Sequence, residues 1–167
     1  MTTPADRTIV TADFSRPDHA AALITIMDSY AAGETGTGTG LSEQVRAKLP
    51  STLAGIQHGF SLLAYKNDVA AGLANCFMQF STFQCMPIIN IHDLAVCPDH
   101  QREGIGSALI AAVVQEAERR GCCKVTLEVL SGNTQAQRLY QRHGFGPYQL
   151  QKSTGYSLFW EKPLSDS

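Results

Sequence analysis

One run of the sequence, residues 88–145, constrains the fold more than any other part of the chain. It opens with β-branched and aliphatic residues that suit a buried strand, and Pro98 ends this strand because proline has no amide donor. A turn follows at 101–106, where Gly104 and Gly106 allow the backbone to approach a ligand closely. The pattern predicts a buried strand that leads directly into a glycine-bearing turn.

Helix and strand signals alternate after this turn. Apolar residues fall at helical spacing from about Ser107 to Arg120, and Gly121 is typical of a left-handed helix end. Residues 124–130 alternate between apolar and polar, as in a half-buried strand, and residues 131–133 are suited to cap a further short helix. The run therefore predicts strand, turn, helix, strand and helix, in that order.

The start of the first of these helices is suited to binding phosphate. Backbone amides at a helix N terminus, together with the helix dipole, stabilise an anion without a dedicated cation. A dinucleotide-binding fingerprint is excluded, because it needs a glycine where Leu109 stands. A second glycine-rich stretch, residues 33–40, lacks the Gly-Lys-Ser/Thr ending of a nucleotide-binding loop. We interpret it as a flexible loop, with a lid over the acceptor as the alternative.

The rest of the chain adds two helices before the run and strands on both sides of it. One helix begins at Pro17, and a second begins at Leu41 and is interrupted at Pro50. Further strands are expected at Thr8 to Ala12, Phe60 to Lys66, Val69 to Thr82, Gly146 to Leu150 and Ser157 to Lys162. The order β-α-α-β-β-β-α-β-α-β-β predicts an α/β fold with a mixed, mostly antiparallel central sheet flanked by helices.

Composition and charge exclude several classes of function. The 167 residues, 44% of them hydrophobic, fit a single domain over 1–167. A net charge of −2 without a basic run argues against a nucleic-acid partner. The N terminus lacks the pattern of a signal peptide, and no apolar stretch approaches the ~20 residues of a membrane span. We therefore expect a cytoplasmic protein without membrane association.

Cysteine and histidine spacing gives no sign of a metal or a disulfide framework. The five cysteines form an odd set without a CxxC pair, so reduced thiols are expected. Cys97 lies close to the glycine-bearing turn, but burial as a small apolar side chain is favoured over thiol chemistry. The histidines show no zinc-like spacing with one another or with cysteines, so no metal is expected.

Four features of the run occur together: the strand end Leu94-Ala95-Val96, the turn Gln101-x-x-Gly104-x-Gly106, Asn133 and Tyr140. In this combination the run resembles the Gcn5-related N-acetyltransferase (GNAT) family. The resemblance covers roughly residues 60–167 and implies the fold of that family, with acetyl-CoA as co-substrate. It assigns acetyl-CoA binding to Leu94, Ala95, Val96, Gln101, Arg102, Glu103, Gly104, Ile105, Gly106, Ser107, Asn133 and Tyr140.

The resemblance also implies a chemical role for Tyr140. It follows Asn133 by seven residues, about two helical turns, so both lie on one face of the short helix. A tyrosine in this context protonates the CoA thiolate in the resembled family. A phenol with a pKa near 10 is well matched to that proton transfer.

The strand before the turn contains two candidates for the general base, His92 and Asp93. Strict strand alternation points His92 and Asp93 to opposite faces of the sheet. His92 is our first choice as base, because an imidazole accepts a proton near neutral pH. Asp93 is the alternative, either as base or as a group that binds the acceptor ammonium or anchors the sheet.

The expected reaction is transfer of an acetyl group to a primary amine of a small molecule, by direct attack in a ternary complex. The segments 80–83 and 92–94 resemble the spermidine/spermine-like and thialysine-like branch, although His92 stands where that branch tends to carry Glu. The small net charge does not favour the acidic pocket of an aminoglycoside acetyltransferase. A protein or peptide N-acetyltransferase and a non-catalytic CoA-binding protein remain alternatives, and the resemblance implies a homodimer.

Overall fold

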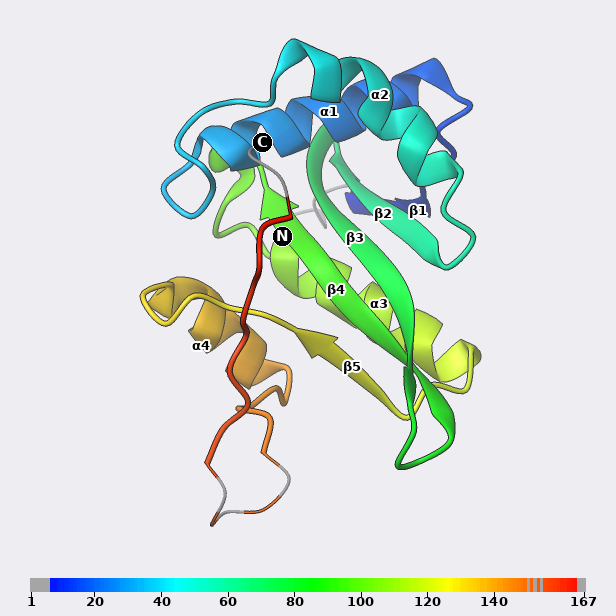
Figure 1. Ribbon diagram of the computed structural model, residues 1–167. Helices are drawn as coiled ribbons and strands as arrows, with labels where there is room; N and C mark the ends of the chain where they lie inside the picture. The colour runs from blue at the N-terminus through cyan, green and yellow to red at the C-terminus, as the bar shows by residue number, and fades with distance from the viewer. Residues whose placement is uncertain (1–6, 150, 152, 154, 165–167) are drawn as a thin grey trace, which may run out of the picture.

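The computed structural model describes residues 7–149, 151, 153 and 155–164. Its centre is one five-stranded sheet in the order β1-β2-β3-β4-β5. Strands β1 to β4 pair antiparallel, and β5 pairs parallel to β4. The strands are β1 (Arg7–Thr11), β2 (Gly59–Lys66), β3 (Val69–Ser81), β4 (Met86–Val96) and β5 (Lys124–Leu127). The predicted mixed, mostly antiparallel α/β fold is confirmed (Figure 1).

Helices cover both faces of the sheet (Figure 1). The first two pack on one face, the third packs on the opposite face, and the fourth lies beside the end of β5. They are α1 (Pro17–Ala32), α2 (Glu43–Ala54), α3 (Ile105–Arg119) and α4 (Thr134–Arg142), with a short 3-10 helix at Pro98–His100. Gly121, with φ 68°, follows the end of α3 as predicted.

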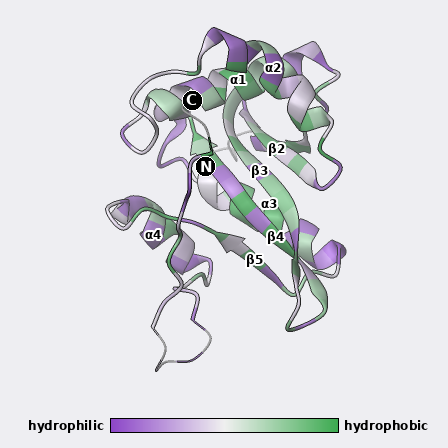
Figure 2. Ribbon diagram, in the orientation of Figure 1, coloured by the Kyte–Doolittle hydropathy of each residue, from purple (hydrophilic) through white to green (hydrophobic). Residues whose placement is uncertain are grey.

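Buried apolar side chains hold each helical layer against the sheet. On the α1 face, Leu23 and Ile26 pack against Leu63. On the α3 face, Leu109 packs against Ile89. Figure 2 shows the hydrophobic residues concentrated along β3 and α3. Because each fully buried side chain of this size contributes ~1.5–3 kcal/mol, the two layers fix the position of β4 and the start of α3.

Strands β4 and β5 separate soon after they begin to pair. Their pairing runs from Ile88 with Lys124 to Ile91 with Leu127. Beyond that point β4 continues along β3, whereas residues 128–130 leave the sheet. The β5 side of β4 therefore presents main-chain groups that have no strand partner among the described residues.

A β-bulge interrupts β4 at His92. Neighbouring residues Asn75 and Cys76 of β3 pair with Asp93 and Ile91 of β4, so His92 is the extra residue between them. A bulge of this kind breaks strict alternation of side chains between the two faces. The sequence contains no Gly or Pro at this point that would indicate it.

The bulge makes our prediction of opposite faces for His92 and Asp93 wrong. The His92 ring contacts the ring of Phe77, with centroids 5.4 Å apart, and Asp93 accepts a hydrogen bond from the Asn75 side chain. Phe77 and Asn75 are two residues apart on β3 and share one face. Both candidate bases therefore lie on the sheet face covered by α1.

Two further predictions about secondary structure are also wrong. Residues 146–149 and 157–162 form no strand, and Leu150 lies outside the described residues. Pro147 has no amide to donate, and the Tyr148 ring packs under the Lys124 ammonium instead, 4.5 Å from its centroid. A hydrogen bond from Ser157 N to Tyr148 O, at 3.0 Å, joins the two segments.

Helix α2 continues through Pro50, where we expected an interruption. Proline removes one backbone hydrogen bond from a helix, and here it stands in the second half of α2. Leu49 and Leu53 on either side pack against the α1 cluster. Their burial offsets the loss of that bond and keeps the helix intact.

Candidate active site

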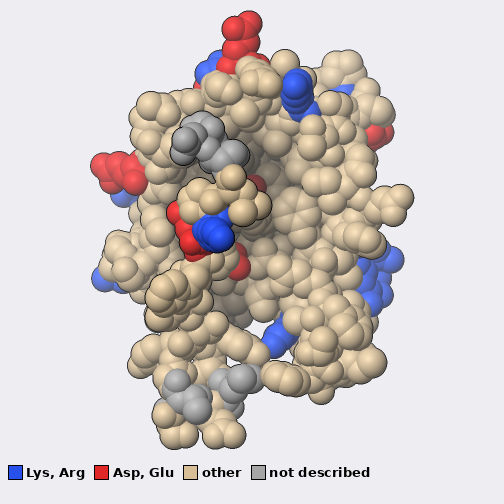
Figure 3. All heavy atoms as spheres, viewed as in Figure 1, with Lys and Arg blue, Asp and Glu red and all other residues tan. Residues whose placement is uncertain are grey.

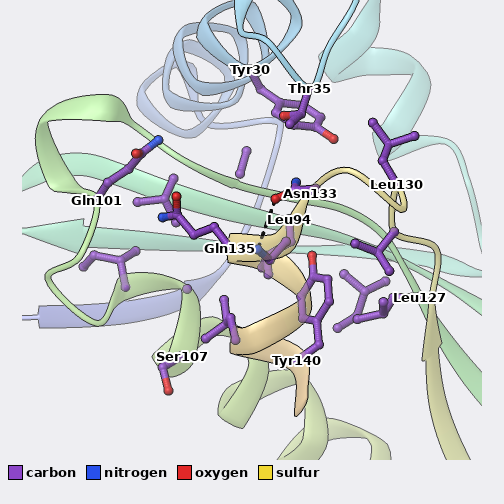
Figure 4. A pocket seen from close by; sticks show the side chains of 18 of the residues that line it. Tyr30, Thr35, Leu94, Gln101, Ser107, Leu127, Leu130, Asn133, Gln135 and Tyr140 are labelled. Carbon is purple, nitrogen blue, oxygen red and sulfur yellow. Dashed lines mark hydrogen bonds between the residues drawn. The ribbon is translucent and has the colours of Figure 1, made fainter. Parts of the chain in front are cut away.

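A cleft of about 730 Å³ opens where β4 and β5 separate (Figure 4). Its walls come from the edge of β4, the turn before α3, the first turn of α3, the chain after β5, and α4. The predicted acetyl-CoA residues that line it are Leu94, Ala95, Val96, Gln101, Arg102, Gly104, Ile105, Gly106, Ser107, Asn133 and Tyr140. Figure 3 shows this face of the molecule hollowed at its centre, with acidic side chains at the edge of the hollow.

The turn before α3 depends on backbone conformations that few residues adopt. Arg102 and Gly104 have φ angles of 61° and 82°, in the left-handed region. A Cβ on Gly104 would lie 2.7 Å from Arg7 Nη1, and a Cβ on Gly106 would lie 3.1 Å from Leu139 Cδ2. The two glycines therefore let the turn close tightly and let α3 approach α4. The first amides of α3 consequently lie at the wall of the cleft, where they can bind an anion.

Glu103 is the one predicted acetyl-CoA residue of the turn that does not line the cleft. Its carboxylate accepts from Lys66 Nζ at 2.5 Å and lies 3.2 Å from His100 Nδ1. Its carbonyl oxygen accepts from Arg7 Nη1 at 3.1 Å. The hydrogen bonds from Lys66 and then His100 lower the pKa of the carboxyl. The Glu103 side chain thus anchors the turn to β2, and its main-chain carbonyl anchors the turn to β1.

The β4 edge offers its main chain to the cleft while its side chains pack in the core. Ala95 is buried in the α1 cluster, and Leu94 and Val96 pack against the α3 cluster. Because β5 has diverged at this level, the peptide groups on that side face the cleft. Main-chain contacts between Leu94, Ala95 or Val96 and an extended ligand require this arrangement.

Ser107 and His143 join α3 to the end of α4. The Ser107 hydroxyl lies 2.6 Å from His143 Nε2, and Ser107 lines the cleft. His143 caps the C terminus of α4. The pair places a hydroxyl and an imidazole together where an anion would bind.

Helix α4 brings Asn133 and Tyr140 to the cleft. Asn133 caps the helix, and its Oδ1 accepts from Ala136 N at 3.1 Å. In Figure 4 the Tyr140 hydroxyl points into the cleft, and Tyr30 of α1 lies on the opposite side. Burial, and to a smaller extent the neighbouring Tyr30, raises the pKa of Tyr140. The phenol is therefore protonated at neutral pH and can donate its proton.

His92 and Asp93 have different positions relative to the cleft. His92 lines it, whereas Asp93 lies just behind its wall. A chain of side chains holds Asp93: Ser61 Oγ donates to Asn75 Oδ1 at 2.6 Å, and Asn75 Nδ2 donates to Asp93 Oδ2 at 2.9 Å. The arrangement presents an imidazole to the cleft and fixes a carboxylate beside it.

Glu128 lines the cleft and was missed by our reading of the sequence. Its Oε1 and Oε2 atoms each lie 3.4 Å from Asn90 Nδ2, which also donates to Thr126 Oγ1 at 3.2 Å. The alternation of residues 124–130 places Thr126 and Glu128 on the polar face of that strand. The local alternation of residues 124–130 does not show where β5 separates from β4, and this separation brings Glu128 to the cleft.

The glycine-rich loop at 33–40 packs against the end of α1. Gly38 N donates to Ala31 O at 3.0 Å, and Leu41 N donates to Asp28 Oδ1 at 2.8 Å. Thr35 lines the cleft and lies near Tyr30 (Figure 4). The loop thus forms part of the cleft rim, and its role as a lid stays a prediction.

The described part of the chain gives no support for a metal site, a reactive thiol at Cys76 or Cys97, or a membrane-spanning helix. Within it, no three His, Cys, Asp or Glu side chains gather as they would around a metal ion. Burial raises the pKa of the Cys76 thiol to about 12, and burial also raises that of Cys97. Across the same residues, the helices are too short or too polar to cross a bilayer.

Comparison with known proteins identifies a family. The family model described as the acetyltransferase (GNAT) family matches residues 26–145. The [ribosomal protein bS18]-alanine N-acetyltransferase of Escherichia coli K12 is 36% identical over 63 residues, which are 38% of this chain and 43% of that protein. Bovine thialysine N-epsilon-acetyltransferase is 31% identical over 83 residues, covering 50% of this chain and 47% of that protein. These matches span about half the length of the relatives.

Solved structures share the fold over nearly the whole chain. A probable acetyltransferase superposes with a TM-score of 0.78 at 20% identity, covering 96% of this chain and 99% of that one. The aminoglycoside N-acetyltransferase AAC(6')-Iy in complex with CoA gives a TM-score of 0.74 at 18% identity, covering 97% and 98%. At these identities the likeness concerns the fold.

Proposed function

We propose, because the chain belongs to the acetyltransferase (GNAT) family, that this protein transfers an acetyl group from acetyl-CoA to a primary amine of a small molecule. One observation carries the proposal. The anion-binding turn at the start of α3, the open edge of β4 and the Tyr140 hydroxyl all face a single cleft. Such a cleft fits an extended ligand that has phosphates at one end and a reactive thioester further along.

Each part of the cleft matches a part of acetyl-CoA. The amides from Ile105 onward and the Ser107 hydroxyl would bind the diphosphate at the positive end of α3. The free peptide groups of Leu94 and Val96 would bind the pantetheine arm and polarise the thioester carbonyl. Asn133, which caps α4, lines the same cleft as Tyr140.

The reaction requires three proton movements. The amine nitrogen attacks the carbonyl carbon, so that a C–N bond forms and the C–S bond breaks. The attacking amine is mostly protonated near neutral pH and must lose a proton first. His92 takes that proton, directly or through water, and Tyr140 gives its phenolic proton to the departing sulfur. The attached nitrogen loses a second proton as it becomes the neutral amide, and this proton passes through water to the Tyr140 phenolate. Both groups act within the same cleft, as direct transfer in a ternary complex requires.

Asp93 acts beside His92 in this proposal. Asn75 holds its carboxylate in place, and the bulge turns it to the same face as His92. A fixed negative charge at this point favours an ammonium group approaching the cleft. Glu128 adds a second carboxylate on the other side of the β4–β5 opening.

Two alternatives follow from the relatives and from the cleft. The bS18-alanine N-acetyltransferase has a protein substrate in its name, which favours a peptide acceptor as the second candidate. The thialysine enzyme and the aminoglycoside N(6')-acetyltransferase type 1 of Salmonella typhimurium, 26% identical over 91 residues, are named for small amines. A protein that binds CoA without catalysis is the third candidate.

A panel of acceptors tests the proposal. Release of CoA thiol from acetyl-CoA is measured with diamines, thialysine, amino acids, aminoglycosides and peptides, each against a blank without acceptor. Release with small amines and its loss in Tyr140→Phe support the proposal. Release with peptides alone moves the assignment to a peptide acceptor, and binding of CoA without release from any acceptor leaves the non-catalytic reading. Sedimentation at two protein concentrations tests the expected homodimer.

A further inference from the structure

A second cavity, of about 320 Å³, lies on the same sheet face as the cleft. It is enclosed by the end of β1 and the segment after it, the last turn of α2, the start of β2, and β3. Apolar side chains dominate its lining, among them Ala12, Phe14, Leu53, Ile56 and Phe77. The volume is close to the lower end of the ~300–1,000 Å³ range of small-molecule pockets.

Phe77 separates this cavity from the cleft. Its ring lines the cavity and makes an edge contact with the ring of His92, at 5.4 Å between centroids and 68° between planes. The ring stands over Gly59, where a Cβ would lie 3.0 Å from Phe77 Cε1. Gly59 therefore gives the ring its space. The cavity begins one aromatic ring away from the proposed base.

Two polar side chains of the lining already have partners. The Asp13 carboxylate accepts from Ser15 N at 3.0 Å and from Ser15 Oγ at 2.6 Å. The Ser61 hydroxyl donates to Asn75 Oδ1 at 2.6 Å. Apolar surface makes up slightly more than half of what the cavity exposes, so an uncharged group that is largely apolar fits it.

We infer that this cavity receives the apolar part of the acceptor, and this inference rests on the proposed function. An amine held at His92 can extend across the Phe77 ring into the space between Leu53 and Ile56. The acceptor class is then a primary amine with a compact aliphatic or aromatic group a few bonds from the nitrogen. Removing that group from water favours binding by ~25 cal/mol per Å² of buried apolar surface.

Kinetics with amines of equal charge test this assignment. With saturating acetyl-CoA, kcat/KM is measured for 2-phenylethylamine, isopentylamine and methylamine. The two apolar amines are expected to exceed methylamine by roughly tenfold or more. Ile56→Trp fills the cavity from a side chain that is 36% exposed, so folding is little affected, and it should abolish the preference for the apolar amines. Leu53→Trp is the second variant.

Val45→Trp is the matched control. Val45 lies on α2, is 41% exposed and does not line the cavity, so its replacement should retain the preference. A wild-type enzyme that treats all three amines alike overturns the assignment. So does a preference that survives both Ile56→Trp and Leu53→Trp.

Methyl resonances give a readout that does not depend on turnover. In CoA-bound protein with labelled methyl groups, 2-phenylethylamine should shift the Ile56 and Leu53 signals, and methylamine should not. Unmoved signals overturn the cavity assignment even when CoA release with amines upholds the proposed function. Absence of CoA release with every amine overturns the proposed function itself.

Discussion

His143 Nε2 and the Ser107 hydroxyl lie 2.6 Å apart, and this contact couples the end of α4 to the first turn of α3, where we propose that the diphosphate binds. When Nε2 carries a proton it donates to the Ser107 oxygen, whose own hydrogen can then point into the cleft. When Nε2 lacks a proton it accepts the hydroxyl hydrogen, and the cleft loses a donor. The imidazole thus controls the direction in which Ser107 donates.

We predict that His143→Ala weakens acetyl-CoA binding through the orientation of Ser107. The expected rise in Kd is roughly fivefold, which corresponds to about 1 kcal/mol for one hydrogen bond. Titration calorimetry with CoA measures it, and His58→Ala is the control because the exposed His58 lines neither cavity. An unchanged Kd in His143→Ala would show that the pair is structural only.

Replacement of Tyr140 by Phe tests its role as the proton donor. The variant keeps the ring that packs near Phe145, with centroids 6.1 Å apart, and removes only the hydroxyl. We expect kcat to fall by ~10²-fold or more while the Kd for acetyl-CoA stays within about twofold. A turnover number equal to that of the wild type would contradict the assignment.

The pH profile of the wild type gives a second test of Tyr140. Because burial raises the pKa of this phenol, its protonated form persists to higher pH than that of an ordinary tyrosine. The decline of kcat at high pH is therefore expected above pH 10, the ordinary value, and not below it. Stopped-flow measurement of CoA release against pH locates the decline, and it should be missing from the residual activity of Tyr140→Phe.

His92→Ala separates the two candidate bases. If the imidazole takes the amine proton, turnover falls by ~10²-fold with little change in acetyl-CoA affinity. Asp93→Asn keeps an oxygen that can accept from Asn75 and should lower turnover less. The reverse order of the two effects, at saturating acceptor, would move the role of base to Asp93.

Gly104→Ala and Gly121→Ala form a matched pair for the turn. Both residues have positive φ angles, 82° and 68°, so each alanine costs about 1 kcal/mol of folding free energy. A Cβ at Gly104 also displaces Arg7 from the Glu103 carbonyl, whereas Gly121 has nothing within 4 Å of the same position. Gly104→Ala should lower the unfolding temperature at least as much as Gly121→Ala, and only Gly104→Ala should raise the Kd for acetyl-CoA. If both variants changed the Kd for acetyl-CoA equally, the turn at Gly104 would have no specific role in binding the ligand.

Glu116 makes stability depend on pH at the acidic end. Hydrogen bonds from Arg119 and, less strongly, Arg120 lower its pKa from 4.5 to about 2. The folded state therefore gains stability above pH 4.5, and this gain is lost as pH falls towards 2. Glu116→Gln should lower the free energy of unfolding by ~0.5–1 kcal/mol at pH 7 and leave it unchanged near pH 2. Urea unfolding at the two pH values measures the difference. Glu118→Gln, two residues along α3, should show no such difference.

Most of the fold could be predicted from the sequence because the strongest signals in the sequence are local. Residues 88–121 showed a buried strand, a proline stop and an amphipathic helix ended by Gly121, and each of these elements is present. The bulge at His92 depends on the register between β3 and β4, which no local pattern encodes. The strands expected at 146–150 and 157–162 need a sheet edge that receives them, and no local pattern encodes such an edge.

The candidate site likewise contains residues that the sequence predicts and residues that only tertiary packing brings to the cleft. The turn from Gln101 to Ser107 was recognisable because its glycines are required by backbone geometry. Glu128 reaches the cleft only because β5 leaves β4 after Leu127, and the Phe77–His92 contact depends on the same bulge. Side chains that meet through tertiary packing have no signature in a single sequence.

Mass analysis of the acceptor after incubation with acetyl-CoA tests the central claim most directly. A panel of primary amines is incubated with wild-type protein and with Tyr140→Phe, and free CoA is quantified in the same samples. The account predicts an amine that gains one acetyl group, with one CoA released per product, and a strongly reduced yield in Tyr140→Phe. Protein that binds CoA but yields no acetylated amine from any member of the panel would contradict it.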